Sequence, residues 1–237
     1  MKKLIALMAL ALTLTACGGD QKPKETKEEL KQEEVAKEET KEEVKEVNKE
    51  EAEEVKEDIQ EIDEDDILTY VGKTYKTDGY NIDVIKAGRV DQTYKLGPVN
   101  LTVYGILSGR MKDFDEELKT YYETDEPIDV VMIVYSVENT EDKNLHFYVG
   151  QSPITTDTKE QIDPDLFAGL EGGGEMLGQV EKDGASIYYP KDAESIREIT
   201  WHVNSVNDEN FTNIAEGIKI KFTFNDKGNQ VTAEELK

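Results

Sequence analysis

The chain of 237 residues contains a single cysteine, Cys17, and this scarcity excludes several kinds of chemistry. No intramolecular disulfide can form. Once Cys17 is modified, no thiol remains for nucleophilic catalysis or for a thiolate metal site. Any folded domain must therefore be held together by its core alone. The roughly 170 residues from Ile67 onward are enough for one domain of ordinary size.

Histidine is almost as scarce, since only His146 and His202 occur. A zinc triad would need carboxylates for its remaining ligands, and we expect both histidines to lie on the outward side of a strand. Enzyme motifs are missing too, because Gly150-Gln-Ser-Pro-Ile154 lacks the last glycine of a nucleophile elbow and neither Ser-x-x-Lys nor His-Glu-x-x-His occurs. The sequence predicts no catalytic, metal-binding or cofactor-binding residue.

Basic residues are few, with 28 Lys and Arg against 53 Asp and Glu, and residues 67–237 alone have a net charge of −14. Such a domain repels polyanions, so nucleic acid and anionic lipid surfaces are poor partners, while cations and basic proteins are better ones. Solubility of an exported protein is the simpler explanation of this acidity. Three acidic clusters offer oxygen ligands for Ca²⁺, but none has the loop glycine and terminal glutamate of an EF-hand. We expect solvated surface at each of them: Asp63–Asp66, Asp113–Glu117 and Asp163/Asp165.

Long hydrophobic runs are also absent, apart from Leu4–Ala16, which is shorter than the ~20 residues of a membrane span. Two lysines precede this run, and Leu14-Thr-Ala-Cys17 follows it. This pattern is typical of a bacterial lipoprotein signal peptide over residues 1–16, and an ordinary secretory signal is the alternative. We expect Cys17 to carry the lipid, with acyl chains such as palmitate. The protein would then be anchored in the cell membrane, on its extracytoplasmic face.

Residues 17–66 form a second segment, in which the part from Gln21 to Asp66 has 21 acidic residues, nine lysines and no aromatic residue. Its apolar residues are too sparse for a core. Glutamate often precedes lysine by three positions, which favours helix, but like charges recur every four positions and oppose it. We predict a disordered or partly helical linker that acts as a spacer.

From residue 67 to 237 the pattern changes to short alternating runs broken by turn residues, which predicts an antiparallel β-sandwich of seven to nine strands. In Ile218–Phe224 the apolar residues alternate with lysine and threonine. Val130–Val137 is apolar on both faces, so it should be a central strand. Trp201 alternates with polar neighbours and should fill the core.

Two short helices are predicted between the strands. Asp113 would cap the first, with Phe114, Leu118 and Tyr121 on its apolar face. The second would begin at Thr232, three residues before a glutamate. A single helical turn is possible at Pro164–Leu170, and Gly172–Gly174 should form a flexible loop.

The layout resembles a known family. The residues that carry the resemblance are the opening Val71-Gly-Lys-Thr-Tyr-Lys-Thr-Asp-Gly-Tyr-Asn-Ile-Asp-Val84, the strand ending in Glu138-Asn-Thr140, Gly178-Gln179, and Gly184-Ala-Ser-Ile-Tyr-Tyr-Pro190. They are similar to a domain of unknown function found in Gram-positive lipoproteins, within the immunoprotective extracellular, immunoglobulin-like superfamily. The resemblance covers about residues 68–225 and sets Leu96–Glu126 apart as an insertion. It implies an immunoglobulin-like sandwich used as an interaction module.

Three hypotheses of function follow. The first is a membrane-anchored, non-catalytic binding domain for a protein or envelope component, with Tyr104, Tyr121 and Tyr122 of the insertion at its binding surface. The second is a structural or stress-related envelope spacer without a specific ligand. The third is a hydrolase that uses paired carboxylates, which sequence alone cannot place.

Overall fold

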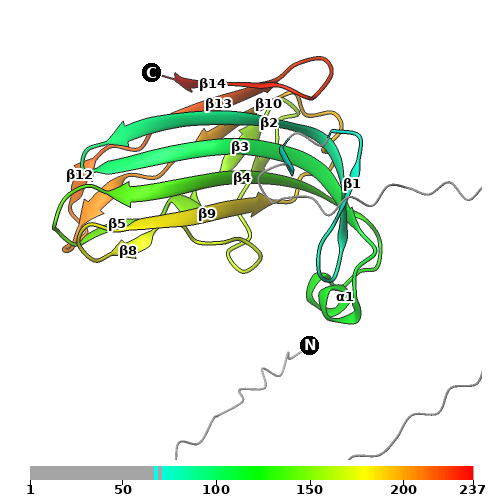
Figure 1. Cartoon of the computed structure of the whole chain (residues 1–237), viewed down its shortest axis with the longest axis horizontal. Coiled ribbons are helices and arrows are strands. Elements are labelled where there is room, and N and C mark those ends of the chain that lie inside the picture. The colour runs from blue at the N-terminus through cyan, green and yellow to red at the C-terminus, as the bar shows by residue number, and fades with distance from the viewer. Residues whose placement is uncertain (1–66, 69–70, 237) are drawn as a thin grey trace, which may run out of the picture. The chain divides into compact units, whose positions relative to one another are not determined.

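The computed structural model describes residues 67–68 and 71–236 (Figure 1). The signal peptide, Cys17 and the linker predicted for residues 1–66 lie outside this part of the chain. The described part is an antiparallel all-β structure with one short α-helix, as the sequence predicts. Among its residues, no helix combines the length and the apolar character that a membrane crossing needs.

The strands assemble into three antiparallel sheets. The first has the order β1-β2-β3-β4-β9, the second β14-β13-β10-β6-β7, and the third β12-β11-β5-β8. In chain order the elements are β1 (Thr74–Lys76), β2 (Asn81–Leu96), β3 (Val99–Lys112), α1 (Glu116–Tyr122), β4 (Ile128–Asn139), β5 (Leu145–Phe147), η2 (Val149–Gln151), β6 (Ile154–Thr156), β7 (Gln161–Ile162), β8 (Gly174–Met176), β9 (Glu181–Tyr188), β10 (Glu198–His202), β11 (Val206–Asp208), β12 (Asn213–Ala215), β13 (Lys219–Phe224) and β14 (Val231–Leu236).

The main core lies between the first sheet and the other two. Trp201 of β10 is fully buried there beside Tyr135 of β4, with ring centroids 5.4 Å apart. The inward residues of β13 are those that the alternation predicts, with Ile220 and Phe222 in the core and Lys219 exposed. The period-two pattern therefore identified which face of these strands is buried.

The first sheet is covered on its outer face as well. Strand β4 sends Val131 and Ile133 into the main core and Val130 and Met132 into a second apolar cluster on the opposite face. The prediction that this strand is apolar on both sides is confirmed. Segment Leu96–Glu126 is no peripheral addition, because its strand β3 pairs with both β2 and β4 along most of its length.

Helix α1 covers part of the second cluster, to which Phe114 and Leu118 belong as the spacing predicts, while Tyr121 does not. Asp115 is the N-cap and accepts a hydrogen bond from the Leu118 backbone N–H at 2.8 Å. The prediction of Asp113 as the cap is wrong, because Asp113 has φ 57° and accepts from the Asn81 side chain instead. The helix begins two residues later than predicted, so Tyr122 packs on the cluster and Tyr121 is exposed.

Three other local predictions are wrong. The segment from Thr232 is strand β14, which pairs with β13 through six residues. Residues 166–168 form a turn without a helix. Gly172–Gly174 is no flexible loop, because all three glycines are buried and a Cβ at Gly173 would lie 2.1 Å from the Phe147 carbonyl oxygen. These glycines allow close packing of two backbones.

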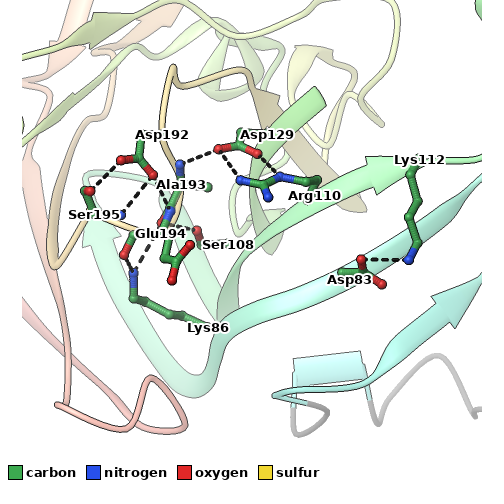
Figure 2. A network of polar contacts seen from close by, with 10 residues as sticks. All are labelled: Asp83, Lys86, Ser108, Arg110, Lys112, Asp129, Asp192, Ala193, Glu194 and Ser195. Carbon is green, nitrogen blue, oxygen red and sulfur yellow. Dashed lines mark hydrogen bonds and ion pairs between the residues drawn. The ribbon is translucent and has the colours of Figure 1, made fainter. Parts of the chain in front are cut away.

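A polar cluster at one end of the first sheet holds the crossover to the second sheet, residues 189–197 (Figure 2). Asp129 of β4 accepts from the Arg110 Nε at 2.6 Å and from the Ala193 backbone N–H at 2.8 Å. Ser108 of β3 donates to the Ala193 carbonyl at 3.1 Å, and the Lys86 ammonium of β2 donates to it at 3.2 Å. Three neighbouring strands thus bind one residue of the crossover.

Replacing Asp129 by alanine should lower the free energy of unfolding by about 2 kcal/mol, because Arg110 and the Ala193 N–H lose their acceptor. The matched control is Asp226→Ala, which breaks another Arg–Asp pair. The Asp129 side chain is only 9% exposed, whereas that of Asp226 is 98% exposed. The control should therefore change stability by less than about 0.5 kcal/mol. Urea unfolding followed by Trp201 fluorescence measures the free energy of unfolding of both variants. Equal losses of stability would show that the buried Asp129 contributes no more than the exposed Asp226.

Candidate interaction surface

The three tyrosines predicted for a binding surface do not come together. Tyr104 lies on β3, where its hydroxyl donates to the Ser136 Oγ at 3.0 Å. Tyr121 and Tyr122 lie on α1, beyond the end of the same strand. Met111, near that end, lies seven positions from Tyr104, which corresponds to ~23 Å along a strand. Only Tyr121 and Tyr122 can belong to one surface.

Asp165 joins α1 to the loop of residues 163–173, which connects β7 to β8. Its two carboxylate oxygens each lie 3.0 Å from the Tyr121 hydroxyl, and one accepts from Tyr189 at 3.1 Å. The backbone N–H groups of Phe167 and Ala168 also donate to Asp165, at 2.8 and 3.1 Å. Tyr122 completes the cluster, because its hydroxyl lies 2.9 Å from that of Tyr189.

These contacts determine how the cluster titrates. Partial burial raises the pKa of Asp165, but hydrogen bonds from the two backbone N–H groups and the two tyrosines outweigh burial and hold the pKa below its usual value. Burial, together with the Tyr122 hydroxyl and the Asp165 charge, raises the pKa of Tyr189. At neutral pH the cluster therefore consists of one carboxylate and three neutral phenols.

The loop is attached to the open edge of the first sheet. Leu170 and Ala185 of β9 exchange two backbone hydrogen bonds, at 2.9 and 2.8 Å, and the Asp165 N–H donates to the Ile187 carbonyl at 2.8 Å. The loop thereby covers an edge that could otherwise pair with another chain. A Cβ at Gly169 would lie 2.5 Å from the Ala185 carbonyl oxygen, so glycine is needed for this approach.

Large apolar side chains of this firmly attached loop point into solvent. Phe167 is 88% exposed, and Leu166 and Leu170 are each 59% exposed. Together with the exposed Tyr121 they form what we call the apolar surface, and a shallow pocket lies beside it. The pocket is lined by Gly150 and Gln151 of η2 on one side and by Leu166, Leu170 and Glu171 on the other. Clustered exposed apolar residues of this kind mark interaction sites more often than scattered ones do.

Both histidines alternate with core residues on their strands and so lie on the outward side, as the sequence predicts, but neither is freely exposed. His146 is buried, because Phe211 stacks on its ring at a centroid distance of 4.1 Å. Phe211 has φ 61° in a tight turn, which the strand pattern does not reveal. His202 is partly buried and lies 2.9 Å from the Thr155 hydroxyl. Within residues 67–68 and 71–236 no group of three His, Cys, Asp or Glu side chains is arranged to hold a metal ion.

Sequence reasoning missed Asp165, Phe167 and Tyr189. The sequence places Asp165 in an acidic surface cluster and allows a single helical turn at Pro164–Leu170. One signal was available. Leu166, Phe167 and Leu170 have the three- and four-residue spacing of a helix face, but Pro164 before them and the glycines at 169 and 172–174 leave too short a segment for a helix that could bury them together.

Comparisons with known proteins find similarity to proteins of Bacillus subtilis. No family model matches it. It is 24% identical over 155 residues to the SPbeta prophage-derived uncharacterized lipoprotein YonS of Bacillus subtilis, covering 64% of this chain and 70% of that one. It is 28% identical over 185 residues to the uncharacterized protein YdhF of B. subtilis, covering 69% and 77%.

Solved structures show a weaker likeness. A functionally unknown protein from Listeria monocytogenes aligns with 50% of this chain and 73% of its own at 9% identity, with a TM-score of 0.41. The yjhA protein from B. subtilis aligns with 49% and 82% at 13% identity, with a TM-score of 0.33. Scores of this size do not establish a shared fold.

The Asp165 carboxyl should titrate below its ordinary value of about 3.9, and replacing either Tyr121 or Tyr189 by phenylalanine should raise its pKa. A lowered pKa stabilises the folded loop above about pH 4, and this contribution is lost as the pH falls through the lowered value. Carbon NMR of the carboxyl group during a pH titration measures the change.

Tyr104→Phe is the control, since it removes a tyrosine hydroxyl that bonds to Ser136 and not to Asp165. It should leave the Asp165 titration unchanged. An unshifted Asp165 in Tyr121→Phe and in Tyr189→Phe would show that these hydroxyls do not hold the carboxylate.

Proposed function

We propose that the chain is an extracytoplasmic lipoprotein, anchored through Cys17, whose β-domain binds a protein or envelope component at the apolar surface. The signal pattern of residues 1–17 supports the anchor, as does the similarity to a B. subtilis protein that is named a lipoprotein. The immunoglobulin-like assignment of the domain stays a prediction that rests on the sequence resemblance. The linker of residues 17–66 would then set the domain at a distance from the membrane.

One observation supports the binding role above the others: loop 163–173 is held firmly while its apolar side chains remain exposed. Its backbone forms hydrogen bonds with β9. The Asp165 carboxylate also accepts hydrogen bonds from Tyr121 of α1 and from Tyr189. A rigid surface loses little conformational entropy on association, which favours recognition. Aromatic residues such as Tyr121 and Phe167 are also over-represented among the residues that dominate binding energies.

The same cluster supports a non-catalytic role. A hydrolase with two carboxylates needs a general acid whose pKa is raised. Asp165 is the carboxylate at the centre of the surface, and its pKa is lowered by four donors. Those donors also occupy the lone pairs that a base would use to accept a proton.

Cys17→Ala should abolish lipid attachment. In the natural host the unchanged protein should sediment with membranes and incorporate an alkyne-labelled palmitate, while the variant should do neither. Phe167→Ser, far from position 17 in the sequence, should keep both properties. Palmitate labelling that persists in Cys17→Ala would remove the basis for the anchor.

A photo-crosslinking amino acid at Leu166 should capture a partner on intact cells. Leu177 provides the matched control, because it is a leucine of similar exposure, 62% against 59%, outside the apolar surface. Adducts of defined size should form from position 166 upon irradiation, should not form from position 177, and should disappear when Phe167→Ser is added. If neither position gives a specific adduct, the spacer hypothesis is favoured and the binding role is not.

A further inference from the structure

We propose that the partner at the apolar surface is a cationic amphipathic peptide segment, in which lysine or arginine alternates with apolar side chains. This inference rests on the binding role proposed above and adds the chemical class of the partner. It follows from what surrounds the exposed apolar residues.

Carboxylates predominate in both segments that contribute residues to the apolar surface. Residues 113–126, which include α1, contain seven acidic side chains and one lysine. That lysine, Lys119, is already paired with Glu116 at 2.7 Å. Residues 160–171 contain four acidic side chains and no basic one. Lys182 of β9 does reach loop 163–173, but its ammonium donates to the carbonyl of Gly173, the last residue of the loop, and to that of Glu175 in β8.

This charge pattern argues against three other occupants. An anionic membrane would be repelled by the net negative charge of these two segments. A second copy of this chain, meeting through the same surface, would bring the acidic segments of the two copies together. The chain's own linker is also excluded on charge, since residues 21–66 have a net charge of −12. Each pairing would juxtapose like charges in a site that loses water.

Strand addition is blocked at this place as well. The edge of β9 next to the surface is bonded to loop 163–173 through Ala185 and Ile187, so its backbone groups are occupied. Recognition therefore depends on side chains. The pocket between η2 and Leu166 is suited to one apolar side chain of the partner, while Asp163 and Glu171 lie within the same loop to attract flanking cations.

The test uses the full mature chain from residue 17 with Cys17→Ser, so that no lipid is attached. Fluorescence anisotropy compares three short labelled peptides, in which lysine alternates with leucine, lysine alternates with serine, or glutamate alternates with leucine. The lysine–leucine peptide should bind most tightly, and salt should weaken its binding because screening acts on exposed charges. The acidic linker also attracts the lysine peptides, and this background binding should be the same in all variants of the apolar surface.

Two pairs of variants separate the apolar and the charged contributions. Phe167→Ser with Leu170→Ser should weaken binding about tenfold or more, while Phe211→Ser with Leu177→Ser, one phenylalanine and one leucine of comparable exposure elsewhere, should leave it within about twofold. Asp163→Asn with Glu171→Gln should weaken it about threefold, while the exposed control pair Asp142→Asn with Glu209→Gln should not.

The outcomes distinguish this inference from the proposed function. Suppose that the glutamate–leucine peptide, or phosphatidylglycerol vesicles, bind as tightly as the lysine–leucine peptide and with the same dependence on Phe167. The partner is then not a cationic peptide, although the apolar surface is still a binding surface. A second result would also overturn only the cationic character of the partner. In that case position 166 forms crosslinks in cells, but the lysine–leucine peptide shows no binding that depends on the apolar surface. Absence of both would overturn the proposed function with it.

Discussion

The need to cover the first sheet on both faces constrains much of this molecule. Strand β4 directs Val131 toward the main core and Val130 away from it, and both are fully buried. Burial of one such side chain stabilises the fold by about 1.5–3 kcal/mol, so the outer face requires its own cover. Helix α1 supplies part of that cover through Leu118 and Tyr122. Once Tyr122 is directed inward, Tyr121 is turned toward loop 163–173, and the apolar surface is assembled as a consequence.

Much of the sheet structure was predictable because it depends on local alternation. Each strand residue points to the face opposite its neighbours, so a period of two identifies the buried face of β13 and of β10, including Trp201. The unbroken apolar run of β4 likewise predicts burial on both sides. In the candidate surface, α1 and the placement of Tyr121 and Tyr122 on one element were predictable from the same kind of local pattern.

The remaining features depend on contacts between distant parts of the chain, which local patterns do not contain. Asp113 and Asp115 are equally good caps in isolation, and the choice between them depends on Asn81, which lies on another strand and binds Asp113. Three consecutive glycines are typical of a flexible loop, yet here they are buried where two backbones meet. The pairing of β14 with β13 outweighs a capping pattern at Thr232 in the same way. Asp165 belongs to the surface only because Tyr121 and Tyr189, 44 and 24 residues away, converge on it.

The shape of the apolar surface and the charge around it have a common origin. Loop 163–173 keeps Phe167 in solvent because Asp165 accepts from the Phe167 and Ala168 N–H groups on one side and from Tyr121 and Tyr189 on the other. Hydrogen bonds to the charged form of a carboxyl group are stronger than those to its neutral form, so this geometry depends on ionisation. A protonated Asp165 would loosen the loop and remove one negative charge together. For a cationic partner, protonation of Asp165 would therefore weaken binding in two ways. The loop would be less preorganised, and the electrostatic attraction would be smaller.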